Sequence, residues 1–157
     1  MYRCLIANRG EIAVRIIRAC REMKIETVAI YAKGDEDSLH VSLADQAICI
    51  GEANPLDSYL NIERIISAAE ITGANAIHPG YGFLSESTTF AEAVEENDIH
   101  FIGPNKKTME MMGDKITARQ TVHAANVPVI PGSDGEVESV DEIKKLAEEI
   151  GYPLVLK

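Results

Sequence analysis

The sequence of 157 residues has no tryptophan and few cysteines, and its basic residues are in the minority. Cys4, Cys20 and Cys49 lie in apolar surroundings without C-x-x-C spacing, so we expect buried thiols, and we exclude a disulfide framework. Fifteen basic residues against 25 acidic ones give a formal net charge of −10. Because a nucleic-acid partner needs a basic stripe, we predict no nucleic-acid binding. Because the protein as a whole is negative, a site that binds an anion would need a local cluster of positive charge.

Long hydrophobic runs are also absent. The apolar stretch after Met1-Tyr2-Arg3 is too short for the hydrophobic region of a signal peptide. No run approaches the roughly 20 apolar residues of a membrane span. With the few cysteines, these absences predict no membrane partner and a cytoplasmic location. The four histidines are His40, His78, His100 and His123. Their spacing is not that of metal ligands, which disfavours a metal site built from them.

What the sequence does contain is a repeated strand–helix pattern. Short apolar runs typical of buried parallel strands occur at Cys4–Ala7, Thr27–Tyr31, Ala47–Ile50, Ala74–His78 and His100–Ile102. Helical periodicity lies between several of them, over 11–23, over 61–72 with a left-handed stop at Gly73, and over 88–97 with a cap at Asn97. The pattern predicts an α/β fold with an open, parallel, Rossmann-like sheet and helices on both faces.

The character of the chain changes near residues 112–114, where we place a domain boundary. A helix is predicted from the N-cap Asp114 to about Ala125, and a second helix from a capping box at Ser139–Glu142 to Gly151. Since 46% of all residues are hydrophobic, the chain can bury a sizeable core. The region 113–157 is short for a domain, and we expect it to be incomplete.

Residues 152–157 predict a final apolar strand that carries Lys157 at its carboxyl end. A cation at the end of a buried strand is costly unless it faces a ligand or a paired charge. In nucleotide enzymes such a lysine meets a phosphate, and a glycine-rich loop covers it. No such loop follows here, so we expect the chain to be the front of a larger protein.

Two loops are candidates for a site, because ligands of open parallel sheets bind at the carboxyl ends of the strands. The first, Ala7–Ala13, has only one glycine where a dinucleotide fold would carry G-x-G-x-x-G, which disfavours NAD. Its plainer interpretation is a tight turn made by Asn8 and Gly10, with Arg9 paired to a carboxylate.

The second loop, His78–Glu86, places two glycines around a tyrosine and adds a histidine, a serine and a glutamate. Loops this dense in special residues often shape a ligand site. The alternative is a tight turn in which Tyr81 and Phe83 pack into the core and His78 bonds to backbone. Composition does not decide between the two.

These loops belong to a longer series of motifs that resembles biotin carboxylases and runs along essentially the whole chain. The motifs, in the family's order, are Asn8–Cys20, Ser38–Val41 with Ala44-Asp45, Ser58–Ile62, Ala76–Glu86, Phe101–Pro104 and Met112–Lys115.

The resemblance implies an ATP-dependent ligase. In such enzymes ATP phosphorylates bicarbonate to carboxyphosphate, with Mg²⁺ or Mn²⁺, and the carboxyl group passes to biotin on a biotin carboxyl carrier protein or domain, so we expect these cofactors and this partner for the intact protein. It also implies a pre-ATP-grasp domain over 1–112 and the truncated start of an ATP-grasp domain over 113–157. Acetyl-CoA carboxylase (the enzyme of fatty acid biosynthesis), propionyl-CoA carboxylase and pyruvate carboxylase share this front region. The final acceptor of the carboxyl group therefore stays open.

Residue roles follow by the same resemblance. Lys115 and Lys157 match lysines that contact the ATP phosphates, and Tyr81 and Gly82 match the loop at the biotin and bicarbonate end of the cleft. A homodimer is implied when the enzyme is intact, with its contact near a helix face that is formed by Arg15, Arg18 and Glu22.

The chain departs from the family pattern in three ways. Ser87 replaces a common asparagine and can still cap the following helix, and Lys24 replaces a usual glycine, which suggests a different turn. The glycine-rich loop, the metal-binding glutamates and the catalytic base are missing. We therefore predict no catalytic residue, no metal site and no activity in this chain alone. The alternative is a stand-alone, non-catalytic module that associates with carboxylase subunits.

Overall fold

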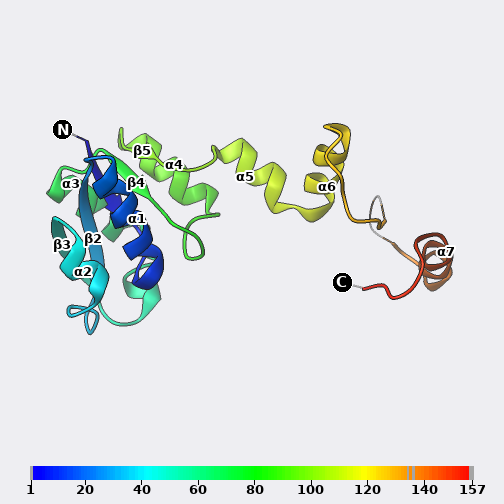
Figure 1. The fold of residues 1–157 in the computed structure, drawn as a ribbon, viewed down its shortest axis with the longest axis horizontal. Coiled ribbons are helices and arrows are strands. Elements are labelled where there is room, and N and C mark those ends of the chain that lie inside the picture. The colour runs from blue at the N-terminus through cyan, green and yellow to red at the C-terminus, as the bar shows by residue number, and fades with distance from the viewer. Residues whose placement is uncertain (1, 134, 136, 156–157) are drawn as a thin grey trace. The chain divides into compact units, whose positions relative to one another are not determined.

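A five-stranded, all-parallel sheet organises the first of two compact units, Met1–Met109 and Glu110–Lys157 (Figure 1). The computed structural model describes residues 2–133, 135 and 137–155. The strand order is β3-β2-β1-β4-β5. The strands are β1 (Arg3–Ile6), β2 (Glu26–Ala32), β3 (Gln46–Gly51), β4 (Ala76–His78) and β5 (His100–Phe101). The predicted α/β fold class is confirmed.

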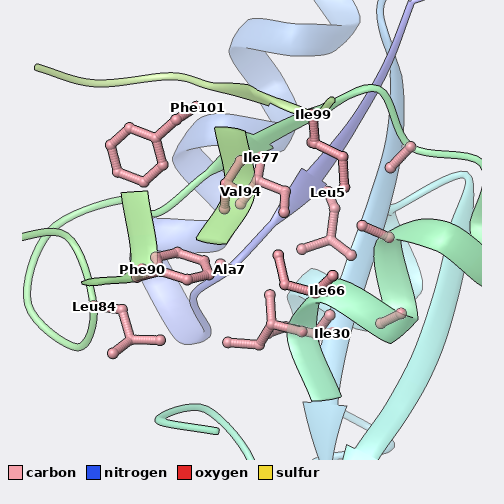
Figure 2. Close-up of a cluster of buried hydrophobic side chains, with 14 of the residues drawn as sticks. Leu5, Ala7, Ile30, Ile66, Ile77, Leu84, Phe90, Val94, Ile99 and Phe101 are labelled. Atoms are coloured by element: carbon pink, nitrogen blue, oxygen red, sulfur yellow. The ribbon is translucent and has the colours of Figure 1, made fainter. Parts of the chain in front are cut away.

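Helices cover both faces of the sheet, as the sequence predicts. One face packs on α1 (Gly10–Glu22) and α2 (Leu39–Leu43) through a small cluster that includes Cys4, Ile6 and Ile17. The other face packs on α3 (Ile62–Thr72) and α4 (Thr88–Glu96). Figure 2 shows this larger cluster, in which Leu5, Ile30 and Ile77 from three strands meet Ile66, Phe90 and Val94 from the two helices.

The helix boundaries follow from their caps. Asn61 and Ser87 accept hydrogen bonds from the amides of Arg64 (3.1 Å) and Phe90 (3.2 Å), so the predicted role of Ser87 as a cap is confirmed. Gly73 ends α3 at φ 65°, also as predicted. At the end of α4, Asn97 is the C-cap, as predicted, but it has φ −96° and not the expected positive φ, and the left-handed residue is Asp98, at φ 56°.

Two positions bear on the sequence-based expectations. Lys24, after α1, adopts φ 58°, a left-handed conformation that a glycine would take without strain, and its different turn from the family's stays a prediction. Cys4 and Cys20 are buried, but Cys49 is exposed. It lies on the edge strand β3 between Ile48 and Ile50, which face the α3 side, so alternation turns the Cys49 side chain the other way.

Three short elements lie outside the predicted ones: α2, the 3₁₀ turn η1 (Pro55–Asp57), and α5 (Lys106–Gly113), which spans the division between the units. The second unit contains α6 (Lys115–Ala124) and α7 (Val140–Ile150). Asp114 and Ser139 cap these helices, as predicted. The predicted capping box differs in one hydrogen bond. The Glu142 carboxylate accepts from the amide of Glu138 and not from the amide of Ser139, the N-cap residue.

The predicted final strand is wrong over its described part. Tyr152–Val155 form bends and coil, mostly exposed to solvent, and residues 156–157 lie outside the described residues. A strand needs a neighbour to pair with, and the described part of the second unit contains no other strand. Among the helices that the structure describes, none is both long and apolar enough to cross a membrane.

Candidate functional site

The sheet has a topological switch point between β1 and β4. From β1 the chain winds through α1 on one face towards β2 and β3, and β4 continues through α4 on the other face towards β5. The two strand ends are joined by a hydrogen bond from the Ala7 amide to the His78 carbonyl (2.8 Å). Ligands of open α/β sheets bind in the crevice outside such a point. Both loops that the sequence singles out flank it.

Asn8 locks the two loops together. Its side chain is 1% exposed, and its amide nitrogen donates to the carbonyls of Pro79 (2.8 Å) and Tyr81 (2.9 Å). Its amide oxygen accepts from the Arg9 amide (2.9 Å). A buried amide with all these partners rigidifies both segments. The sequence indicated only a tight turn here, because partners some 70 residues away depend on the strand order.

Gly80 is required at its position by both space and conformation. It has φ 68°, and a Cβ atom would come within 2.7 Å of the Asn8 amide nitrogen and of the Ile12 side chain. Gly10 has φ 59° with open space around it, so only its conformation favours glycine. The close approach of the second loop to Asn8 therefore depends on Gly80.

His78 acts as a neutral acceptor beneath the second loop. Its Nδ1 accepts from the Gly80 amide (3.0 Å), which places the proton on Nε2. Burial lowers the pKa of His78, which favours this neutral form near pH 7. The predicted hydrogen bond between His78 and the backbone is confirmed, with His78 as the acceptor.

The aromatic residues of the second loop do not pack as the core interpretation predicts. Tyr81 is 66% exposed, and its hydroxyl lies 3.3 Å from a carboxylate oxygen of Glu11. Phe83 is 36% exposed and stacks on the buried ring of Tyr59, at 5.4 Å between ring centres. Tyr81 lies between two left-handed glycines, Gly80 and Gly82, and the loop returns to the core at Leu84. This arrangement favours the ligand-site interpretation.

A pocket of about 480 Å³ lies at the crevice, between α1 and the second loop. Its α1 side consists of one cation, Arg15, one anion, Glu11, and two apolar residues, Ile12 and Ile16. Its loop side consists of His78, Gly80 and Tyr81. Gly82 follows at φ 69° with no atom near its Cβ position, so its backbone stays accessible. The pocket can therefore offer a hydroxyl, a guanidinium and backbone groups to a small polar ligand.

Arg9 makes the ion pair that the plainer interpretation predicts. Its guanidinium lies 3.4 Å from a carboxylate oxygen of Asp35, and it also lies over the rings of Tyr59 and Phe83. Arg15, Arg18 and Glu22 are exposed along α1 and take part in no ion pair among the described residues. Their predicted role in a dimer contact stays a prediction.

The second unit carries the other predicted site residues. Lys115 is exposed in the first turn of α6, just after Asp114. The Asp114 carboxylate accepts from the Thr117 amide (2.7 Å), and this hydrogen bond lowers the pKa of Asp114. Lys157 lies outside the described residues, so its predicted phosphate contact stays a prediction. Within the described ranges, no three His, Cys, Asp or Glu side chains are grouped to hold a metal ion, so these residues do not fit Mg²⁺.

Known proteins resemble this chain closely. Residues 1–109 match the family model described as "Biotin carboxylase, N-terminal domain", and residues 114–157 match "Carbamoyl-phosphate synthase L chain, ATP binding domain". Biotin carboxylase 1 of Bacillus subtilis is 57% identical over 98% of this chain and 34% of its own length. Biotin carboxylase of Haemophilus influenzae is 54% identical over 100% of this chain and 35% of its own length.

Solved structures of biotin carboxylases are also similar to this chain. The Hydrogenobacter thermophilus 2-oxoglutarate carboxylase biotin carboxylase domain dimer, in complex with MgADP, ADP and bicarbonate, is 54% identical with a TM-score of 0.82. The match covers 96% of this chain and 33% of that one. The biotin carboxylase–beta-gamma-ATP complex from Campylobacter jejuni is 52% identical with a TM-score of 0.85, over 96% of this chain and 34% of that one. This chain spans about a third of the length of its curated relatives. The expected resemblance is confirmed, and the chain belongs to the biotin carboxylase family, of which it contains the N-terminal domain.

Proposed function

We propose that this chain forms one wall of the active site of an ATP-dependent biotin carboxylase. In the intact ligase, ATP phosphorylates bicarbonate, and the carboxyl group is transferred to biotin on a carrier protein. The observation that carries the proposal is the pocket at the switch point, bordered by Tyr81, in a chain of this family. Relatives of known structure bind bicarbonate and MgADP.

Within this proposal the pocket loop faces biotin and bicarbonate. Tyr81 offers an exposed hydroxyl, and Gly82 offers backbone groups with nothing above them. Asn8 donates to the Tyr81 carbonyl, and His78 accepts from the amide of Gly80, the residue before Tyr81, so both hold the loop in place. Such preorganised donors are effective in catalysis because they need no rearrangement when the reaction occurs.

The phosphates of ATP belong to the second region in this proposal. Lys115 and Lys157 supply positive charge to phosphate oxygens, which phosphoryl transfer requires. We assign residues 1–112 to the pre-ATP-grasp domain and 113–157 to the beginning of the ATP-grasp domain. The Mg²⁺ or Mn²⁺ ions must come with carboxylates from elsewhere in the enzyme, because the described residues do not group any for that purpose.

Partners follow from the same assignment. We propose a biotin carboxyl carrier protein or domain as the substrate partner, a cytoplasmic location, and a homodimer that uses the α1 face of Arg15, Arg18 and Glu22. One relative of known structure is a dimer. The final acceptor of the carboxyl group is not set by this region, since relatives include both 2-oxoglutarate and pyruvate carboxylase components.

A chimera tests the proposed function. The matching first third of the Bacillus subtilis relative is replaced by this chain, which is 57% identical to it. We expect bicarbonate-dependent ATP hydrolysis and carboxylation of free biotin by the chimera, and neither activity from this chain alone. A chimera that folds and dimerises but does not carboxylate biotin would contradict the proposal. Activity of the chain alone above a buffer control would contradict its assignment as one wall of a site.

A further inference from the structure

Arg9 contacts a pair of stacked aromatic rings at the edge of the site. Its guanidinium carbon lies 5.2 Å from the centre of the Tyr59 ring and 5.7 Å from that of Phe83. The two rings are nearly parallel, with planes 10° apart. Three segments distant in sequence therefore meet at this point: the turn after β1, the connection before α3, and the loop after β4.

Tyr59 is the fixed member of this group. Its side chain is 0% exposed, and its hydroxyl donates to the Asp35 carboxylate (2.6 Å) and accepts from the Ala32 amide (3.0 Å). Burial raises the pKa of Tyr59, which keeps the hydroxyl protonated. Asp35 also pairs with Arg9, so one carboxylate anchors both the ring and the guanidinium that lies over it.

Phe83 is the strained member. It has φ 39°, a left-handed conformation that a phenylalanine adopts only where its surroundings enforce it. It directly follows Gly82 and lies two residues after Tyr81, so its backbone conformation determines how those two residues are oriented at the pocket. Its ring contacts the buried ring of Tyr59 and the guanidinium of Arg9.

We propose that Arg9 is a positioning residue. Together with Asp35 and Tyr59 it clamps the ring of Phe83, and this clamp sets the conformation of Tyr81 and Gly82 at the pocket. The inference rests on the proposed function, because there Tyr81 and Gly82 face biotin and bicarbonate. Arginine suits this position because its planar guanidinium can lie over aromatic faces while it donates to a carboxylate.

A role of Arg9 in stability alone explains the arrangement less well. The side chains of the Arg9–Asp35 pair are 44% and 28% exposed, and their nearest atoms are 3.4 Å apart. Ion pairs with this exposure contribute little to stability. The distinctive feature is the contact of the cation with both rings, and one of these rings belongs to the loop that borders the pocket.

Arg9→Lys tests the clamp, because lysine keeps the charge opposite Asp35 but loses the planar group. The matched control is Arg21→Lys, at an exposed arginine of α1 that bonds to the Leu43 carbonyl (2.7 Å) away from the pocket. Amide hydrogen exchange is measured in this chain for residues 80–87 and for β1 and β2. For Arg9→Lys we expect exchange in 80–87 to accelerate several-fold, up to about tenfold, with β1 and β2 unchanged.

Either of two exchange results would overturn the clamp: no change in residues 80–87, or an equal acceleration throughout the first unit. If Arg9→Lys does not fold, the same exchange measurement on Asp35→Asn tests the clamp, with the same result expected in residues 80–87. Asparagine keeps an acceptor for the Tyr59 hydroxyl and removes the negative charge opposite Arg9.

The positioning role is tested by kinetics in the active chimera described above. Arg9→Lys should raise KM for free biotin several-fold and leave KM for ATP unchanged, whereas Arg21→Lys should change neither. A loosened loop with an unchanged KM for biotin would overturn the positioning role. An inactive parent chimera would contradict the proposed function instead, and the exchange result would still decide whether the clamp exists.

Discussion

At the scale of single residues, the site depends on a few side chains that bond across long sequence distances. Asn8 joins the turn after β1 to the carbonyls of Pro79 and Tyr81, and His78 accepts a hydrogen bond from the Gly80 amide. These contacts involve backbone groups, so they fix the path of the loop rather than the identity of its side chains. Substitutions at Asn8 should therefore act on the loop and on stability together.

Asn8→Ala should destabilise the first unit by about 2–3 kcal/mol, because it removes one buried and one part-buried hydrogen bond and leaves two carbonyls without their donor. The measurement is urea unfolding followed by circular dichroism. Asn54→Ala is the control, since the Asn54 side chain makes its bonds at an exposed turn. Equal and small effects of the two substitutions would show that Asn8 does not lock the loops.

Lys24→Gly should stabilise the protein by about 1 kcal/mol, because Lys24 is left-handed at φ 58° and glycine adopts that conformation without strain. Lys24 is exposed, so no buried contact is lost. Thermal unfolding measures the effect, and Lys33→Gly, at a residue outside the left-handed region, serves as the control. A lower melting temperature for Lys24→Gly would contradict the assigned backbone conformation.

His40 should make stability depend on pH. It is buried, with Nε2 bonded to the Ile30 carbonyl (3.2 Å) and no partner for Nδ1 among the described residues. Burial lowers the pKa of His40, and the neighbouring charges of Asp35 and Arg9 act in opposite directions. The unfolded chain therefore binds this proton more readily than the folded one.

The stabilising effect of neutral His40 is complete above the unfolded pKa of 6.5 and is lost as the pH falls below it. Between pH 7.5 and 5.5 the free energy of unfolding should fall by about 1 kcal/mol from this residue. Urea unfolding at both pH values measures the fall, and His40→Gln should reduce it. The same fall in both proteins would assign the pH dependence to other groups.

At the scale of elements, the sequence predicted the parts whose hydrophobic periodicity is strong. All five strands and the helices α1, α3 and α4 form where the pattern predicts them. The short α2 and the polar, methionine-rich α5 lack such a pattern and were missed. The final strand was wrongly predicted because an apolar run alone cannot show whether a pairing partner exists.

The candidate site was only partly predictable for a related reason. Both loops could be identified from their composition, and the ion pair of Arg9 and the backbone bond of His78 were predicted correctly. The outward position of Tyr81 and the role of Asn8 were not, because both depend on β1 and β4 being neighbours. Strand order is a property of the whole sheet and is not written in any one segment.

Ser87 starts α4 directly after the pocket loop, and its hydroxyl accepts from the Phe90 amide. Ser87→Ala should destabilise the first unit by about 1 kcal/mol. Urea unfolding measures this, with Thr89→Ala as the control at an exposed position of the same turn. If the two variants are equally stable, the cap does not contribute as described.

At the scale of the whole molecule, the two compact units differ in how much core they contain. The first unit has a sheet covered on both faces, whereas in the described part of the second unit the only fully buried hydrophobic residue is Ala147. Helices without a packed face open readily. Amides of α6 and α7 should therefore exchange at least about 100-fold faster than those of β1 and β2. Equal protection in both units would contradict this difference.

The central claim is that this chain carries one wall of a carboxylase site and not a complete nucleotide site. Calorimetric titration of the purified chain with ATP, with Mg²⁺ and at low salt, tests it most directly. The account predicts no detectable heat, because Lys115 and Lys157 supply only part of the phosphate contacts and no described group of carboxylates could hold the metal. Micromolar binding that Lys115→Ala abolishes would contradict the claim, and would show that a working nucleotide site exists within these 157 residues.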